Sequence, residues 1–396
     1  MMPHIEWLVL IGYLESLFAE SSSRKLEPPP AGPSPETLNR LYLNCMREHE
    51  RKTALFSLRE GRWEPLPDWR LDRRVIRLAL YLQERIGLSA GDRVAVVSEL
   101  RPEAAVADFA ALGLGAVSVV VDADVPANNL VAALIDVGPK VIFASPAGLD
   151  RLDGGTLRLP GLEQVIALDG GELGEGVVRL EAALELGGTL DTAERAQAFR
   201  ANARGVEPGR AAIVHYEGSE NREPRWQELS QGEAVQRVEA IWGTQQPSAG
   251  DRVYLIAPEF SLAVRLALYA SLGDGYSSAA LASSLGTAAE LTELRPHRVI
   301  ASPGIIAQLV RRARAAAPPP ARPGGWRARA ALLFRQRKEP MMQQAMRDVL
   351  GSQVRGISPT EPLDPALAAN LQGVTLIGPP VGRTAHVWTG SERGGV

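Results

Sequence analysis

The stretch that decides the fold runs from Leu88 to Ser145 and reads LSAGDRVAVVSELRPEAAVADFAALGLGAVSVVVDADVPANNLVAALIDVGPKVIFAS. Short apolar runs rich in valine alternate in it with longer segments that carry apolar residues at helical spacing. Such runs predict strands buried on both faces, and their alternation with helices is typical of a parallel sheet. The expected strands are 93–98, 116–121 and 140–144, and the expected helices are 102–114 and 127–137. The fold class is therefore α/β.

The segments on either side extend this unit. Upstream, a hairpin is expected around the Glu60-Gly61 turn, and a helix follows that ends at Gly87. Downstream, a further strand is expected at 164–168. The polar, glycine-rich segment 170–205 then predicts a connection to the next unit. The hairpin strands are 54–58 and 62–66.

The same alternation returns after Gly250. Strands are expected at 253–256 and 298–301, with helices at 262–271, 285–294 and 303–316. The sequence therefore predicts two similar parallel-sheet α/β subdomains side by side. The predicted division is an amphipathic helix and proline-rich tether at 1–35, subdomains at 36–205 and 206–317, and a final segment at 318–396 that opens with a basic linker.

Composition limits the classes of function. The chain has 396 residues and a formal net charge of −3, so no excess of basic charge points to nucleic acid. Cys45 is the one cysteine, which excludes an internal disulfide and a multi-cysteine zinc site. The five histidines are scattered without metal-ligand spacing, so no metal site is expected. The apolar run near the N-terminus lacks a basic flank and is too short to span a bilayer, so we expect a cytoplasmic protein.

Two amphipathic segments are candidates for partner contacts. Residues 5–18 predict a helix on a stiff tether, which would dock on a protein partner or on a membrane surface. Packing against its own domain is the alternative. Residues 326–338 carry arginines around Leu332, Leu333 and Phe334. This segment would lie on the anionic inner face of a membrane, or it would form a solvated arginine-rich helix face.

A third stretch, Ala211 to Ser230, reads AAIVHYEGSENREPRWQELS. Residues 211–215 predict a buried strand and Glu228 begins a predicted helix, so a tight loop is expected between them. A strand, loop and helix often form a phosphate-binding frame, which needs glycines, hydroxyls and a lysine. The loop 217–226 instead has one glycine, one hydroxyl and three glutamates, and carboxylates repel a triphosphate. The sequence therefore predicts the strand–loop–helix arrangement of a phosphate site without the residues that bind phosphate.

With these segments in order, the chain resembles the large N-terminal domain of the adenylate-forming (AMP-binding) enzymes, in the long-chain fatty acyl-CoA synthetase branch. The resemblance runs from about Thr37 to about Gly382 and is best over 88–145, with LPGLEQVIALD (159–169) and LRPHRVIASPGIIAQLV (294–310) also similar. It implies a reaction in which a carboxylate attacks ATP to form an acyl-adenylate, and coenzyme A then takes the acyl group. ATP, magnesium and coenzyme A would be the cofactors, and a mobile C-terminal domain would supply a lysine.

The family's phosphate loop, Tyr-Thr-Ser-Gly-Thr-Thr-Gly-x-Pro-Lys-Gly, aligns without a gap on Tyr216 to Trp226. Two positions match outright, and one arginine keeps the charge of the lysine. The resemblance assigns the degenerate phosphate loop to Tyr216, Gly218, Ser219, Arg222, Pro224 and Arg225. The alternative is a surface loop in which the two arginines pair with the neighbouring glutamates.

Two adenine-region motifs are also altered. Ser-Gly-Gly-Ala-Pro-Leu resembles Ser358 to Leu363, where bulkier residues replace both glycines and the alanine. Gly-Tyr-Gly-x-Thr-Glu resembles Gly378 to Arg383, although in a rival alignment Thr360 and Glu361 take its Thr-Glu positions. In the alternative, Glu361 and Asp364 are solvated turn residues. The resemblance assigns the degenerate adenine region, a remnant within 318–396, to Ser358, Pro362 and Gly378.

The chain also stops at Val396, before the positions expected for the family's ribose-binding aspartate, hinge and C-terminal domain, and Ser261 stands where the fatty acyl branch would have a histidine. We therefore expect a pseudoenzyme: an acyl-CoA synthetase-like protein that has lost ATP-dependent adenylation and serves as a non-catalytic binding or scaffold subunit. It would have no catalytic residue and need no cofactor. The alternatives are an acyl-activating ligase completed by a partner chain, with ATP, magnesium and coenzyme A, and a fatty acyl binder that works without ATP.

Overall fold

A computed structural model describes residues 35–47, 53–121, 127–152, 159–170, 173–219, 222–245, 250–258, 260–273, 277–316, 338–371, 374 and 376. All of them belong to the unit Pro35–Val396. The predicted helix at 5–18, its tether and the basic residues 326–337 lie outside this description. The protein and membrane contacts expected from those segments therefore stay predictions.

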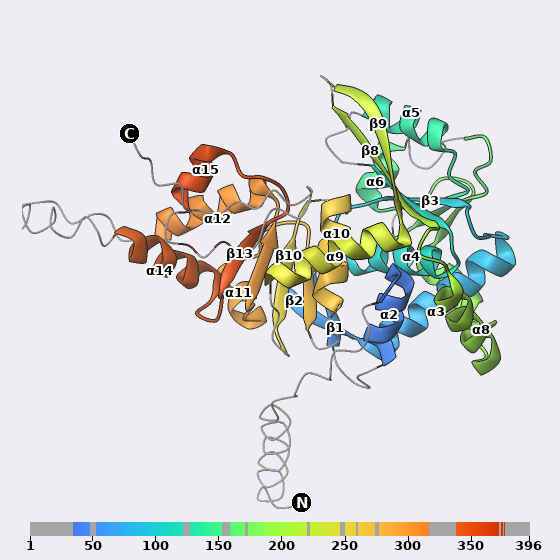
Figure 1. The fold of residues 1–396 in the computed structure, drawn as a ribbon, viewed down its shortest axis with the longest axis horizontal. Helices are drawn as coiled ribbons and strands as arrows, with labels where there is room; N and C mark the ends of the chain where they lie inside the picture. Colours follow the sequence, from blue (N-terminus) through green and yellow to red (C-terminus); the bar gives the residue numbers. More distant parts are fainter. Residues whose placement is uncertain are drawn as a thin grey trace, which may run out of the picture. The chain divides into compact units, whose positions relative to one another are not determined.

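A seven-stranded sheet forms around the stretch 88–145, and Figure 1 shows it with α5 and α6 beside it. Every neighbouring pair in it is parallel except the last, in which β8 and β9 are antiparallel. The predicted parallel sheet is confirmed, because the apolar runs form strands and these strands pair in parallel. The strand order is β7 (Val177–Arg179), β6 (Gln164–Ala167), β5 (Val141–Ala144), β3 (Arg93–Val97), β4 (Val117–Val121), β8 (Ala211–Ser219) and β9 (Arg222–Ser230).

A second sheet has six strands and is also parallel, apart from the antiparallel pair β1 and β2. The predicted hairpin around Glu60-Gly61 is confirmed, with both turn residues in the left-handed region at φ 49° and 77°. The strand order is β13 (Gly356–Pro359), β12 (Arg298–Ala301), β10 (Arg252–Ile256), β11 (Ser278–Ala282), β1 (Thr53–Arg59) and β2 (Arg62–Pro67).

Each sheet combines strands from both halves of the sequence. The early strand β1 pairs with β11, with Leu55 opposite Ala279. The later strand β8 pairs with β4, with Ile213 opposite Ser118. Each sheet thus takes one hairpin from the other half of the sequence. The predicted domain boundary at residue 205 stays a prediction, but the sheets cross it.

The helices form a central layer and two outer layers. In the central layer, every residue of α4 and α10 is buried. The main hydrophobic cluster joins these two helices to α2, α3, α8 and α9 and to one face of each sheet. The central helices are α2 (Leu38–Arg47), α3 (Asp68–Arg85), α4 (Pro102–Gly113), α7 (Leu180–Gly188), α8 (Ala193–Gly205), α9 (Gln231–Gln245) and α10 (Leu262–Leu272).

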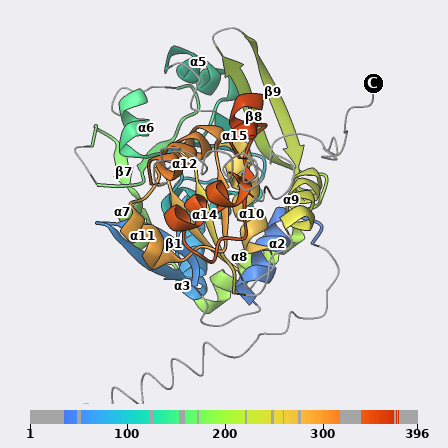
Figure 2. The same cartoon turned by 90° about the vertical axis from the view of Figure 1, so that its left-hand side faces the viewer.

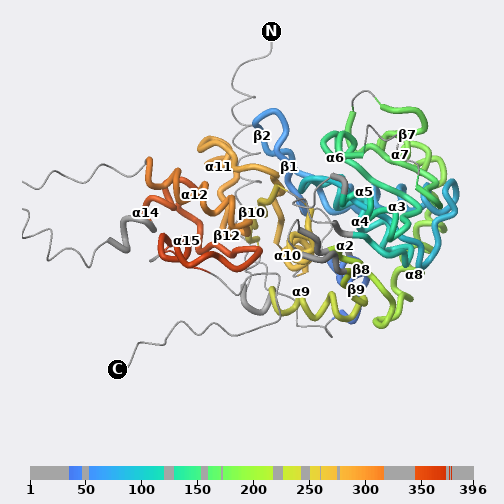
Figure 3. Tube along the Cα trace, turned by 90° about the horizontal axis from the view of Figure 1, so that it is seen from above, coloured from blue at the N-terminus to red at the C-terminus, as the bar shows by residue number. Residues whose placement is uncertain are grey.

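Two further hydrophobic clusters lie on the outer faces of the sheets, one on each sheet. Strand β10 shows the division, because Val253 and Leu255 belong to the central cluster while Tyr254 and Ile256 belong to an outer one. Successive side chains of a strand point to opposite faces, so both faces of this strand are apolar. Figures 2 and 3 show the outer helices of the six-stranded sheet gathered together. The outer helices are α11 (Ala288–Leu294), α12 (Pro303–Ala316), α14 (Lys338–Leu350) and α15 (Pro365–Asn370) on that sheet, and α5 (Ala127–Val137) and α6 (Pro146–Arg151) on the other.

The predicted connection at 170–205 is wrong. This segment contains β7, α7 and α8. Its glycines misled the prediction, because Gly187 marks a close helix contact and does not mark a loop. A β-carbon at this position would lie 1.9 Å from the carbonyl oxygen of Arg77 on α3. Thr192 caps the start of helix α8, since its side chain accepts a hydrogen bond from the Arg195 N–H at 3.3 Å.

We expect the substitution Gly187→Ala to lower the free energy of unfolding by about 1–3 kcal/mol, because the added methyl group must push α7 away from α3. Urea unfolding followed by circular dichroism measures this change. The matched control is Gly205→Ala at the end of α8, where a β-carbon meets no atom within 4 Å. Equal losses for both variants would contradict the close contact.

Candidate functional site

The candidate site lies where loops follow the carboxyl ends of strands from both sheets. In parallel α/β sheets, ligands bind outside these ends. The loop after β10 meets the loop after β3 here, since the Phe260 N–H donates a hydrogen bond to the Ser98 carbonyl at 3.1 Å. On the same edge, the Thr360 N–H donates to the Ala301 carbonyl at 3.0 Å. Both sheets therefore contribute to one edge.

The stretch predicted as a phosphate loop is a β-hairpin. Strand β8 continues through Ser219, and β9 begins at Arg222, so the two strands are connected by residues 220–221. The pairing places Tyr216 opposite Trp226 and Ser219 opposite Arg222. The prediction of a tight loop followed by a helix from Glu228 is wrong, because Glu228 lies on β9 and α9 begins at Gln231.

An aromatic pair, Tyr216 on β8 and Trp226 on β9, stabilises the hairpin. The rings of Tyr216 and Trp226 meet edge to face with centroids 4.7 Å apart. Such cross-strand aromatic pairs stabilise antiparallel strands. The Trp226 indole Nε1 also donates a hydrogen bond to the Asp136 carboxylate on α5 at 2.5 Å. Tyr216 is 5% exposed, so its ring serves the core of this sheet.

The other residues assigned to the degenerate loop lie on the same two strands. Gly218 and Ser219 are on β8, and Arg222, Pro224 and Arg225 are on β9. Their backbones are described and their side chains lie outside the description, so the assignment of these side chains stays a prediction. The ladder directs backbone groups of both strands toward each other.

The adenine-region residues are spread over a strand and a turn. Ser358 is 3% exposed and lies on β13, opposite Ile300 of β12. Pro362 is exposed, four residues further along the chain, before α15. Gly378 lies outside the described residues. The structure thus places Ser358 within the sheet and Pro362 beyond the strand end.

Charged residues at the carboxyl edge of the seven-stranded sheet compensate one another. Arg101, in the loop after β3, forms ion pairs with Glu99 at 3.1 Å, Glu103 at 3.0 Å and Asp169 at 2.7 Å. Arg59, at the end of β1, reaches the same Glu103 carboxylate at 2.5 Å. Burial opposes ionisation of Asp169, but hydrogen bonds from Arg101 and from the Gly170 N–H lower the pKa of that carboxyl below its ordinary value. This network ties the two sheets together.

Behind this edge lies a buried ion pair that the sequence did not predict. Arg265 on α10 and Asp108 on α4 are both 0% exposed, and Arg265 Nη1 lies 3.2 Å from Asp108 Oδ1. The hydroxyl of Ser118 donates to the same carboxylate oxygen at 2.6 Å and accepts from Arg265 at 2.5 Å. A lone arginine in the apolar run LAVRLALYASL was the signal that could have revealed it.

The groups around this pair are incompletely hydrogen-bonded. Arg265 Nε and Nη2 and Asp108 Oδ2 have no hydrogen-bond partner among the described residues. The guanidinium lies 4.6 Å from the centre of the Phe260 ring, a cation–π distance. Burial lowers the pKa of Arg265, and burial together with the nearby Asp108 raises the pKa of the Tyr269 hydroxyl well above its ordinary value.

The described part of the chain offers neither a metal site nor a membrane-spanning helix. No group of three or more histidine, cysteine, aspartate or glutamate side chains there is arranged to hold a metal ion. No helix within the described ranges is long and apolar enough to cross a membrane.

Solved structures establish the class of fold. The adenylation domain of a carboxylate reductase from Mycobacterium chelonae matches with a TM-score of 0.63 at 20% identity, covering 90% of this chain and 58% of that one. A long-chain-fatty-acid-CoA ligase, FadD1 from Archaeoglobus fulgidus, matches with a TM-score of 0.61 at 15% identity, covering 88% and 62%. The two-sheet architecture is that of the N-terminal domain of adenylate-forming enzymes.

The sequence places the chain more narrowly. The model of the AMP-binding enzyme family matches residues 44–383, and the chain belongs to this family. Long-chain-fatty-acid–CoA ligase FadD15 from Mycobacterium bovis is 28% identical over 235 residues, which are 57% of this chain and 36% of that relative. The Mycobacterium tuberculosis protein of the same name matches to the same extent. The match thus spans about a third of the length of these curated relatives.

Proposed function

We propose that this chain is an acyl-CoA ligase-like member of the AMP-binding family that does not adenylate a carboxylate and acts as a binding or scaffold subunit. One observation carries the proposal. The eleven residues that align with the family's phosphate loop, Tyr216 to Trp226, begin and end as paired strands of one hairpin. A phosphate loop holds a nucleotide with backbone N–H groups that point at the ligand, whereas this ladder uses backbone groups for strand pairing.

The chemistry of these residues supports the same conclusion. Tyr216 is buried against Trp226, so its ring is committed to packing. The segment carries three glutamates, which repel a triphosphate, and each lost donor would weaken nucleotide binding by about 1–3 kcal/mol. The residues at this position do not fit a triphosphate. In this proposal ATP, magnesium and coenzyme A are therefore not required.

The adenine region offers a second, weaker argument. Ser358 and Pro359 lie in a strand of the six-stranded sheet, and Thr360 is 1% exposed and bonded to Ala301. The two glycines that would let backbone approach an adenine are a proline and a threonine here. The proline restricts the backbone, and the two side chains occupy space that the glycines would leave open for an adenine.

The well-formed core favours a retained binding role. Both sheets carry continuous apolar clusters on their two faces, and the central cluster joins them. A partner contact through residues 5–18 belongs to this proposal, as does a fatty acyl ligand, since relatives of the chain are named long-chain-fatty-acid–CoA ligases.

Calorimetric titration of the full chain with ATP and magnesium tests the proposal. We expect no heat of binding up to low millimolar ATP, with or without a long-chain fatty acid, because the phosphate position has lost most of the family's glycines and hydroxyls and carries three glutamates. Binding of ATP that is lost in an Arg222→Ala, Arg225→Ala variant would overturn the proposal and favour a ligase completed by a partner chain. Fatty acid heat in the absence of ATP heat would identify the chain as an acyl binder.

A further inference from the structure

A surface hollow of about 360 Å³ lies between the start of α3 and the helices α2 and α8. Its lining includes Asp68, Trp69 and Asp72 from α3. We propose that this hollow is a docking site for an arginine side chain presented by a partner protein. The inference goes beyond the proposed function, because it concerns a different surface and does not depend on whether the chain binds ATP.

The buried carboxylate of Asp68 is the first reason. Asp68 is 2% exposed, and its Oδ1 accepts one hydrogen bond, from the Trp69 N–H at 2.7 Å. Its Oδ2 is buried and has no hydrogen-bond partner among the described residues. A buried carboxylate oxygen without a donor is costly, and Asp68 lines the hollow, so in this proposal an entering guanidinium supplies the missing donor.

The nearby arginines do not serve this carboxylate. Arg200 pairs with Asp72 at 2.5 Å, and that aspartate also accepts a hydrogen bond from the Tyr42 hydroxyl at 3.2 Å. Arg73 pairs with Asp191 at 3.1 Å. The positive side chains that line the hollow are therefore engaged with other acids. Among the described residues, Asp68 is therefore the acid of this hollow that is left without a cation.

The walls of the hollow suit the rest of an arginine side chain. Trp69 is 58% exposed, which is unusual for so large an apolar side chain, and its ring offers a face for a guanidinium. Ile76 and Ala196 are buried and line the same hollow, so they would contact the methylene groups of the arginine stem. Aromatic face, apolar wall and buried acid together match a guanidinium on an aliphatic chain.

The hollow lies away from the carboxyl edge that forms the candidate site. Strand β1 runs parallel to β11 from Thr53, and Pro67 at the end of β2 pairs with Thr53. Asp68 therefore follows a strand end at the amino edge of the six-stranded sheet. Small ligands of such sheets bind at the opposite edge, and a surface with an exposed tryptophan at the amino edge favours a macromolecular partner.

Calorimetric titration of the full chain with a capped peptide containing one arginine tests the inference, with the citrulline peptide as the uncharged match. We expect the arginine peptide to bind at least about tenfold more tightly than the citrulline peptide. Asp68→Asn should weaken arginine binding about tenfold or more, and Trp69→Ala about two- to fivefold. Asp150→Asn, on the exposed surface of α6, is the matched control and should bind normally.

Circular dichroism melts confirm that each variant is folded, and the exposed Trp69 keeps the test valid if Asp68→Asn does not fold. Equal binding of the two peptides, or no binding up to about 10 mM, would overturn the inference. Binding of free n-butylguanidinium as tight as that of the peptide would also overturn it, because the hollow would then select a small cation and not a protein partner.

Discussion

We expect the substitution Asp108→Ala to lower the free energy of unfolding by about 3–5 kcal/mol, because it leaves the buried Arg265 guanidinium without its counter-ion. Both side chains are 0% exposed, so bulk water does not solvate the guanidinium that is left behind. The serine hydroxyl of Ser118 bonds to both members of the pair and would lose one partner as well. Each of these effects acts in the same direction.

Urea unfolding with circular dichroism measures the loss, and a double variant supplies the control. The pair Asp108→Leu, Arg265→Met removes both charges at similar volume, so we expect it to be more stable than Asp108→Leu alone or Arg265→Met alone. The exposed substitution Asp150→Asn should change stability by less than about 0.5 kcal/mol. A double variant as unstable as the sum of the single ones would show that the charges do not act as a pair.

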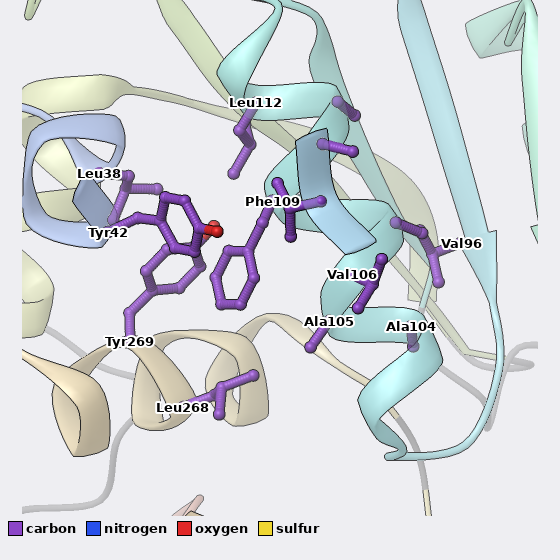
Figure 4. Packing of buried hydrophobic residues seen from close by; sticks show 14 of the residues in the cluster. Leu38, Tyr42, Val96, Ala104, Ala105, Val106, Phe109, Leu112, Leu268 and Tyr269 are labelled. Atoms are coloured by element: carbon purple, nitrogen blue, oxygen red, sulfur yellow. The ribbon is translucent and has the colours of Figure 1, made fainter. Parts of the chain in front are cut away.

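Replacing Phe109 with alanine is the second large effect, with an expected loss of about 3–5 kcal/mol. Phe109 lies on α4, stacks on Tyr42 of α2 with centroids 4.7 Å apart, and meets Tyr269 of α10 edge to face at 5.1 Å. Figure 4 shows the three rings together at the centre of the cluster. The substitution removes the contact between three helices and leaves a cavity.

The same unfolding experiment measures this loss, and Leu186→Ala on α7 is the matched control. Leu186 is 42% exposed, whereas Phe109 is 3% exposed, so the control should cost less than about 0.5 kcal/mol. A small loss for Phe109→Ala would mean that the neighbouring helices close the cavity, and the ring cluster would then not hold the central layer together.

The sequence predicted the elements whose signal is local. Strands β3, β4 and β5 are short apolar runs, and their bounds agree with the predictions to within one residue. The β1–β2 hairpin followed from its Glu60-Gly61 turn. Such elements are predictable from local sequence because the backbone preference of each residue agrees with its burial in the fold.

Elements whose signal is not local were missed. Strand β11 reads SAALA, and small residues between two neighbouring strands carry no clear period. Strand β9 contains a proline and several charges, so its propensity argues against a strand. Its place on the sheet edge tolerates both, and pairing with β8 overrides the propensity.

The conformation of the stretch predicted as a phosphate loop was missed. The resemblance aligned the family's phosphate loop with Tyr216 to Trp226, but sequence could not show that two nine-residue strands would pair there. The Arg265–Asp108 pair was missed because its members are far apart in sequence and meet only in the packed core. The pairing of these strands and of these side chains depends on tertiary contacts, which a local sequence pattern does not show.

The exchange of hairpins between the sheets has a consequence for how the chain is made. A growing chain that has emerged up to the middle of its length holds β1 and β2 before β11 exists, so the first hairpin waits with an open edge. The hydrogen bond from the Trp63 indole to the Glu290 carbonyl closes a loop of 227 residues. Folding of the six-stranded sheet can therefore finish only after most of the protein has left the ribosome, and a product truncated near its midpoint would retain an unpaired strand that invites aggregation.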